Sequence, residues 1–224
     1  MPEQLSFDLP VREALGRDDF FVSPANAEAV AMIEGWQAWP ARKLVLIGPH
    51  GAGKTHLAHV WAALSEARII AADQLTEADI PALAAGPVAV EDIEQIAGNR
   101  PREDALFHLH NLTLAEGNSL LVTAATPANR WPLTLPDLAS RMQGTPYTTL
   151  HEPDDALLTA VLTKLMADRQ LSPAPSVLSY LTRRIERSFE AARDVVERLD
   201  DMALSSGRPI TRTLAAKVLD NPDA

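Results

Sequence analysis

The sequence contains no cysteine, no long hydrophobic run and no excess of basic residues. Without cysteine, neither a disulfide nor a thiolate metal site can form. No segment approaches the ~20 consecutive apolar residues of a membrane-spanning helix. Met1–Gln4 also lacks the basic and then apolar layout of a signal peptide. These absences favour a bacterial-type cytoplasmic protein with no membrane partner.

The charge balance limits the partners further. Lys and Arg total 20 against 30 Asp and Glu, which gives a net charge of −10, and the acidic excess lies mostly within residues 1–150. Such a body repels a phosphate backbone at long range. We therefore expect no strong direct binding to DNA, although a local basic face is compatible with this balance.

The most informative stretch is a glycine-rich loop between two apolar patterns. Leu44–Ile47 is typical of a buried strand, residues 48–55 spell G-x-x-x-x-G-K-T, and a helical pattern continues to about Ser65. This strand, loop and helix context is what a phosphate-binding loop requires. Glycines let backbone N–H groups point at an anion, Lys54 adds a charge for the β/γ-phosphates, and the Thr55 hydroxyl is placed to ligate Mg²⁺. The segment therefore predicts a bound nucleotide.

Two carboxylates follow a later apolar strand, residues 88–90. In nucleotide-hydrolysing proteins one such acid holds Mg²⁺ through water, and the other orients or deprotonates the attacking water. We assign Glu91 to the metal and Asp92 to catalysis. Asp commonly comes first, so the longer Glu91 predicts altered metal geometry and slow hydrolysis. Thr123 or Thr126, at the end of the next strand, is the candidate polar contact to the γ-phosphate.

Strand and helix patterns alternate to about residue 150 and then give way to helices alone. The alternation predicts a parallel sheet with helices on both faces. The expected fold is α/β: a sheet sandwiched by helices, followed by a small all-α lid domain. The expected ranges are strands at 44–47, 68–72, 87–93, 119–123 and 146–150, early helices at 26–39 and 75–83, and lid helices at 154–168, 174–185, 188–204 and 211–219. The expected domains are an extended tail (1–14), a nucleotide-binding α/β domain (15–150) and the lid (151–224).

Arginines provide further candidates. Arg141 lies on a short helix after the fourth strand, where an arginine can project into the nucleotide site of a neighbouring subunit and accelerate hydrolysis by ~10³-fold or more. The alternative for Arg141 is a surface salt bridge. In the helical part, Arg193 follows a helix start at Ser188 and is placed to reach back toward the nucleotide. The other arginines of this part are expected on a solvated face: Arg183, Arg184 and Arg187.

These segments resemble the AAA+ module of the DnaA family of bacterial replication initiators, and within it the short Hda-type homologues that inactivate the initiator. Residues 48–57 look like the family's G-x-x-G-x-G-K-T-H-L segment. Phe20–Val22 with Asn26 is similar to the entry segment that borders the adenine. Residues 135–141 are nearly the Hda form of the box that carries the arginine finger. The resemblance covers about residues 15–220.

The resemblance implies ADP or ATP with Mg²⁺ as cofactors. It assigns Arg141 as an arginine finger that acts in trans, and Thr55 and Glu91 as metal ligands. The nucleotide contacts it implies are Phe21, Val22, Pro49, Gly51, Ala52, Gly53, Lys54, Thr55, His56 and Arg193.

Three departures qualify this assignment. Glu91 replaces the usual Asp of the metal strand, and Ala125 stands where DnaA has an acidic residue. Glu190 falls where a lid arginine normally touches the nucleotide, with Arg193 three residues later. Together they predict a protein that binds nucleotide as a structural switch and hydrolyses it weakly by itself.

The N-terminal segment implies a second partner. Residues 4–9 are similar to the Q-L-x-L-x-L/F peptide with which replication proteins dock on the sliding clamp. Gln4 would form a hydrogen bond, and Leu5 together with Phe7 or Leu9 would enter an apolar pocket. The implied partners are the β sliding clamp and DnaA, with a homodimer left open and replisome association in the cytoplasm.

The function expected from these features is negative regulation of replication initiation through hydrolysis of DnaA-bound ATP. Two alternatives remain. The first is an autonomous AAA+ ATPase that acts as a loader or remodeller, which predicts substantial turnover by the isolated chain. The second is a DnaA-related DNA-binding adaptor. This adaptor would bind DNA in a salt-sensitive way as an isolated protein, and the net charge of −10 argues against it.

Overall fold

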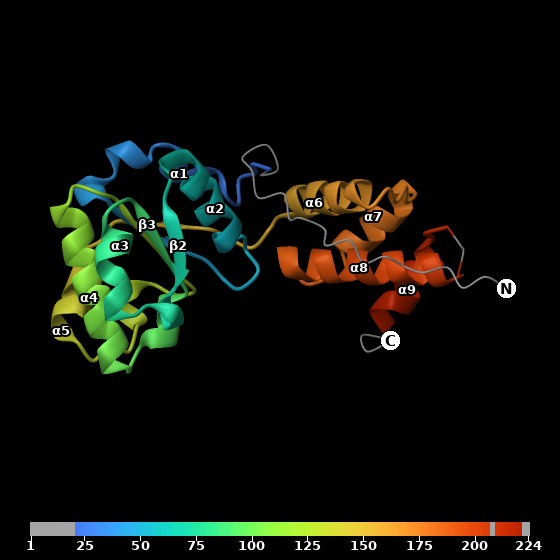
Figure 1. Ribbon diagram of the computed structural model, residues 1–224. Helices are drawn as coiled ribbons and strands as arrows, with labels where there is room; N and C mark the ends of the chain where they lie inside the picture. The colour runs from blue at the N-terminus through green and yellow to red at the C-terminus, as the bar shows by residue number, and fades with distance from the viewer. Residues whose placement is uncertain (1–20, 207–208, 221–224) are drawn as a thin grey trace.

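The computed structural model describes residues 21–206 and 209–220. The predicted clamp-binding peptide, residues 4–9, lies outside these ranges. Figure 1 shows a layered α/β body and, beyond the segment that follows its last strand, a group of helices. None of the helices in the described ranges is long and apolar enough to cross a membrane.

The predicted parallel sheet is confirmed. Its strand order is β2-β3-β4-β1-β5, and every neighbouring pair is parallel. The strands are β1 (Lys43–Ile47), β2 (Arg68–Ala71), β3 (Val88–Glu91), β4 (Leu120–Ala124) and β5 (Tyr147–Thr149). Because Ile47 pairs with Ala124, and Val90 with Val122, the carboxyl ends of β1, β3 and β4 meet at one edge of the sheet.

Alternating side chains of the strands face two layers of helices. Leu44 and Leu46 pack with α1 (Ala27–Glu34) and α2 (Lys54–Ser65). Val45 and Val90 pack on the other face with α3 (Ile80–Ala84), α4 (Arg100–Ala115) and α5 (Pro136–Gln143). Near-continuous apolar strands are therefore buried on both sides, as a parallel sheet requires.

The expected helix over 26–39 is wrong in its second half. Helix α1 ends at Glu34, and two short 3₁₀ turns follow, η2 (Trp36–Ala38) and η3 (Pro40–Arg42). The reason is the burial of Trp39, whose ring stacks on Trp61 with centroids 5.3 Å apart. Its indole N–H donates to the carbonyl of Met32 at 2.7 Å. The chain therefore bends toward the core instead of continuing along the helix axis.

The expected helix over 75–83 is also divided. The structure has the 3₁₀ turns η4 (Ala72–Gln74) and η5 (Glu77–Asp79) before α3 begins at Ile80. Pro81 lies in the first turn of α3, where backbone N–H groups make no hydrogen bond within the helix, so the missing N–H of proline costs nothing. Proline therefore starts this helix, whereas the sequence pattern placed it inside one.

The last four helices of the described chain form a core of their own. They are α6 (Asp155–Asp168), α7 (Pro175–Thr182), α8 (Phe189–Ser206) and α9 (Arg212–Asp220). Leu162, Leu181 and Val196 are fully buried there, in a cluster that includes no residue of the sheet. A separate core supports the predicted boundary near residue 151, which stays a prediction.

Candidate functional site

The glycine-rich loop connects the end of β1 to the start of α2, as predicted. Gly51 and Gly53 have φ angles of 71° and 96°, in the left-handed region that favours glycine. Lys54 is only 8% exposed, and its ammonium donates to the carbonyl oxygens of Gly48 at 2.9 Å and Pro49 at 3.2 Å. The loop thus holds a positive charge beside backbone that curls at the N-terminus of α2, an arrangement suited to phosphate.

The two predicted metal ligands, Thr55 and Glu91, meet beside this loop. Burial raises the pKa of Glu91, a hydrogen bond from the Thr55 hydroxyl lowers it, and the neighbouring Asp92 raises it again. One carboxylate oxygen, Oε1, is buried without a hydrogen-bond partner. Carboxylate and hydroxyl oxygens are ligands that Mg²⁺ prefers. The unpartnered oxygen beside Thr55 therefore fits a hard divalent cation.

Asp92 lies outside the strand that was expected to contain it. Strand β3 ends at Glu91, and Asp92 has φ 54° and ψ 55° at the start of the 3₁₀ turn η6 (Ile93–Ile96). Its backbone N–H donates to the hydroxyl of Thr123 at 3.0 Å. Thr123 is completely buried, so its hydroxyl fixes the backbone of the candidate catalytic acid, a role that differs from the expected contact with a phosphate.

Glu94 occupies the end of β4 and was missed by sequence reasoning. Its carboxylate accepts hydrogen bonds from the backbone N–H groups of Ala125 and, at 3.0 Å, of Thr126. The backbone of Thr126, which was predicted to contact the γ-phosphate, is therefore held by the Glu94 carboxylate. The available signal was a third carboxylate, three residues after Glu91, which the strand pattern alone did not place.

The entry segment is held by Asn26. Asn26 is the N-cap residue of α1, but its side chain makes no capping hydrogen bond. Instead its amide donates to the carbonyl of Phe21 and accepts from the N–H of Ser23, both at 2.8 Å. Phe21 and Val22 are 39% and 51% exposed. The two residues expected at the adenine thus sit on a segment with a fixed backbone and accessible side chains.

The start of α8 packs directly on the phosphate loop. The N–H of Phe189 donates to the carbonyl of Gly51 at 2.8 Å, and a Cβ on Gly53 would lie 2.7 Å from the Phe189 ring. On the surface, His50 Nδ1 lies 2.9 Å from Oε2 of Glu190. Arg193, the predicted lid contact, lies one turn further along α8 and is partly buried. Glu190 therefore brings a carboxylate from the start of α8 to the loop.

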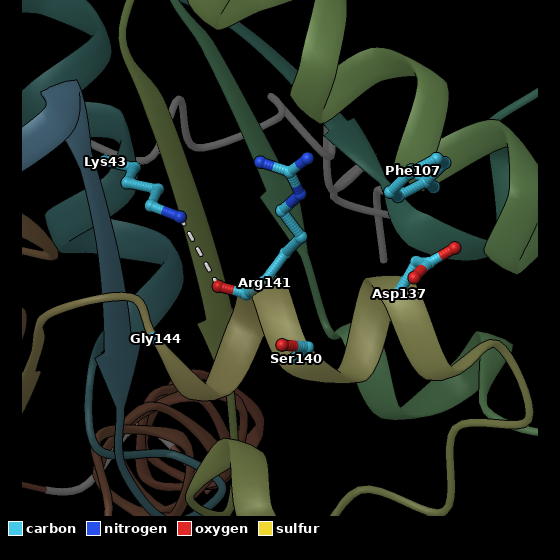
Figure 2. Close-up of a pocket in the computed structure, with 6 residues that line it drawn as sticks. All are labelled: Lys43, Phe107, Asp137, Ser140, Arg141 and Gly144. Carbon is cyan, nitrogen blue, oxygen red and sulfur yellow. Dashed lines mark hydrogen bonds between the residues drawn. The ribbon is translucent and has the colours of Figure 1, made fainter.

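Arg141 lies at the other end of β1. The pocket around it has a volume of about 520 Å³ (Figure 2). It is lined by Lys43, Phe107, Asp137, Ser140, Arg141 and Gly144. The guanidinium carbon of Arg141 is 6.0 Å from the centroid of the Phe107 ring. Lys43 begins β1, whereas the phosphate loop follows its fifth residue, Ile47. At ~3.3 Å per residue, roughly 16 Å separates the pocket from the loop of the same chain.

Glu103 holds the segment that leads into α5 and was also missed. It is fully buried and accepts from Gly98 N–H at 2.7 Å, Leu135 N–H at 2.7 Å and the Thr134 hydroxyl at 2.9 Å. Burial raises the pKa of Glu103, but these hydrogen bonds outweigh it, and the net pKa is lowered. The signal for this role was a carboxylate on the same helical face as Leu106 and His110.

Comparison with known proteins agrees with this architecture. No family model matches the sequence. The chromosomal replication initiator protein DnaA of Thermomicrobium roseum is 25% identical over 92% of this chain and 50% of its own length. The chain therefore spans about half the length of that relative.

Solved structures match more completely. Domain III of the Thermotoga maritima replication initiation protein DnaA has a TM-score of 0.79 at 18% identity, over 95% of this chain and 98% of that one. AMPPCP-bound DnaA from Aquifex aeolicus has a TM-score of 0.71 at 16% identity, over 92% and 69%. The chain is therefore homologous in sequence to DnaA along most of its own length, and it has the AAA+ fold of DnaA domain III.

Proposed function

We propose that this protein is an Hda-type negative regulator of replication initiation. It binds an adenine nucleotide at its own loop, docks on the DNA-loaded sliding clamp through residues 4–9, and presents Arg141 to ATP held by DnaA. Hydrolysis then occurs in the site formed between the two proteins, and the resulting ADP form of DnaA no longer initiates.

The position of Arg141 is the observation that carries this proposal. Its side chain is exposed and lies roughly 16 Å from the phosphate loop of its own chain, by the length of β1. It is therefore poorly placed to act on its own nucleotide and well placed to act on a neighbour's. A guanidinium there stabilises the negative charge that develops on the transferred phosphoryl group.

The nucleotide proposal rests on the loop and on the relatives. The phosphates would lie against Lys54, the left-handed Gly51 and Gly53, and the N-terminus of α2. The Aquifex aeolicus DnaA structure contains AMPPCP, which supports this proposal. Thr55 and Glu91 would hold Mg²⁺, which neutralises phosphate oxygens when bound. ADP or ATP then acts as a structural switch, with weak intrinsic hydrolysis.

The decisive experiment measures hydrolysis of DnaA-bound ATP in the presence of clamp loaded on DNA. The wild-type protein is expected to accelerate hydrolysis, and Arg141→Ala is expected to abolish the acceleration. Arg68→Ala is a matched control, because Arg68 is also exposed but lies on β2 at the far edge of the sheet. Equal rates for wild type and Arg141→Ala would overturn the proposal.

The clamp contact has its own test. Deleting residues 4–9 should abolish retention on a column of immobilised clamp, while the melting temperature of the protein stays unchanged. The acidic net charge of −10 is consistent with a protein that reaches DNA through a partner. Retention of the deleted protein at the wild-type level would remove residues 4–9 from the proposal.

An autonomous ATPase is the second candidate, and the contact between Thr55 and Glu91 favours it, because a metal site is needed for hydrolysis at the chain's own loop. It predicts substantial turnover by the isolated chain, lost in Lys54→Ala. Turnover that rises only when DnaA and loaded clamp are added distinguishes the regulator from this alternative.

A further inference from the structure

The carbonyl oxygen of Arg141 is fixed by two donors. The ammonium of Lys43 donates to it at 3.3 Å, and the hydroxyl of Thr145 donates at 2.8 Å. Lys43 is the first residue of β1, which pairs on both sides with other strands. The last turn of α5 is therefore tied by a cation to an interior strand of the sheet, as favoured at the negative end of a helix.

Lys43 is itself oriented by a buried histidine. Its Nζ lies 3.3 Å from Nε2 of His110, a residue of α4 that is 1% exposed. On the other side of the ring, Nδ1 lies 3.1 Å from the side-chain oxygen of Asn111. That oxygen only accepts, so Nδ1 carries the proton and Nε2 accepts from Lys43. A polar chain thus runs from α4 through Lys43 to the backbone of Arg141.

The charges agree with this assignment. Burial lowers the pKa of His110, as do Lys43 and Arg141, whereas the hydrogen bond to Asn111 raises it, and the net shift is downward. A neutral imidazole is the form that accepts from an ammonium. Within residues 21–206 and 209–220 neither Lys43 nor Arg141 forms an ion pair. The two cations therefore share one pocket with the Asp137 carboxylate but form no ion pair with it.

This pairing of like charges has a geometric consequence. In Figure 2 the ammonium of Lys43 turns toward the Arg141 carbonyl, while the guanidinium of Arg141 projects away from α5 between Lys43 and Phe107. Repulsion from Lys43 disfavours conformers in which the guanidinium folds back toward β1, and the Phe107 ring provides a favourable face within 6.0 Å.

We propose that Lys43 is a positioning residue for the arginine finger: it anchors the last turn of α5 and keeps the Arg141 guanidinium extended toward a partner's nucleotide. This inference rests on the proposed function, because it assumes that Arg141 acts in trans. Lys43 acts through Arg141 and touches no substrate. Its contribution should therefore appear in the rate of the chemical step more than in the affinity for the partner.

The test is the same assay of DnaA-bound ATP, with the rate measured over a range of protein concentrations. Lys43→Met keeps the apolar stem and removes the charge and the donors. We expect the maximal rate to fall about tenfold, as for the loss of one charged hydrogen bond, with an unchanged half-saturating concentration. Lys43→Arg, which restores a cationic donor, should recover most of the rate.

Thr145→Val is the matched control, because Thr145 bonds the same carbonyl without a charge. We expect it to lower the maximal rate less than twofold. The melting temperatures of all variants are measured in parallel. If Lys43→Met is unstable, the maximal rates of Lys43→Arg and Thr145→Val are compared instead. A wild-type maximal rate in Lys43→Met, or an equal loss in Thr145→Val, overturns the positioning role while Arg141→Ala remains inactive. Full activity of Arg141→Ala would instead overturn the proposed function.

Discussion

His50 Nδ1 in the phosphate loop lies 2.9 Å from Oε2 of Glu190 at the start of α8. The two side chains are 88% and 57% exposed, so the contact adds little to the stability of the fold. Its importance is the sign of the charge that it brings to the loop. The resemblance to the DnaA family implies an arginine at this position, whereas here a carboxylate lies beside the glycine-rich loop.

Glu190→Arg should therefore tighten the binding of ATP more than that of ADP. The added γ-phosphate would meet a positive charge in place of a negative one, and we expect the ratio of the two Kd values to shift about tenfold, which corresponds to ~1.4 kcal/mol. Titration with fluorescent nucleotides measures both constants. Glu197→Arg, exposed two turns further along α8, is the control for the change in net charge. An equal shift in both variants would contradict a local effect of Glu190.

Gly53→Ala should weaken nucleotide binding and loosen the contact with α8. The added Cβ would lie 2.7 Å from the Phe189 ring, at a residue whose φ is 96°. The strain is of order 1–3 kcal/mol, so we expect a lower melting temperature, by roughly 2–4 °C per kcal/mol. Gly86→Ala is the matched control, since no atom lies within 4 Å of its added Cβ. Equal melting temperatures for the two variants would contradict the close approach of Phe189.

The sheet and its loop were predictable because their signals are local. Leu44–Ile47 is a short apolar run followed by a glycine-rich loop, and this local pattern is typical of a buried strand. The path after α1 was not predictable, because it depends on the packing of Trp39 against Trp61, residues 22 positions apart in sequence. No periodicity within residues 26–39 carries that information.

The candidate site likewise contains residues that the sequence predicted and residues that it did not. The sequence could predict that Lys54, Thr55 and Glu91 lie close together, because they follow strands whose carboxyl ends meet in a parallel sheet. Glu94 and Glu103 were missed because each carboxylate accepts from backbone N–H groups about 31 residues away. Backbone donors leave no trace in the identity of the residues that carry them, so such a contact has no sequence motif.

Glu103→Gln should destabilise the protein by about 2–4 kcal/mol at neutral pH. Its carboxylate satisfies the N–H groups of Gly98 and Leu135, and a buried donor that loses its partner costs ~1–3 kcal/mol. Urea unfolding of the variant measures the loss. Glu116→Gln, exposed at the end of the same helix, should change stability by less than about 0.5 kcal/mol. A variant as stable as wild type would show that these bonds are dispensable.

The pH dependence of this effect has a definite sign. The pKa of Glu103 is lowered in the folded protein, so its stabilising effect is complete above the unfolded value of ~4.3 and is lost as pH falls through the folded value. The stability gap between wild type and Glu103→Gln should therefore be constant from pH 7 to about pH 5 and narrow below pH 4. A gap that stays constant down to about pH 2 would contradict ionisation of Glu103 as its cause.

Glu91→Gln should stabilise the nucleotide-free protein and remove the effect of Mg²⁺ on nucleotide affinity. Burial raises the pKa of Glu91, so the ionised carboxylate opposes folding at neutral pH. That cost is absent below the unfolded pKa of ~4.3 and appears as pH rises through the folded value. The melting temperature of the variant should therefore exceed that of wild type at pH 7, and the difference should vanish near pH 4.

The two halves of this prediction separate metal binding from folding. Asp92→Asn is the control, because asparagine tolerates the left-handed backbone of Asp92, and the Thr123 hydroxyl still accepts the backbone N–H. Nucleotide titrations with and without Mg²⁺ should show metal-dependent tightening in Asp92→Asn and none in Glu91→Gln. Tightening by Mg²⁺ in Glu91→Gln would exclude Glu91 as a ligand. In that case the buried carboxylate of Glu91 would only lower the stability of the fold, an effect that the melting temperatures measure independently.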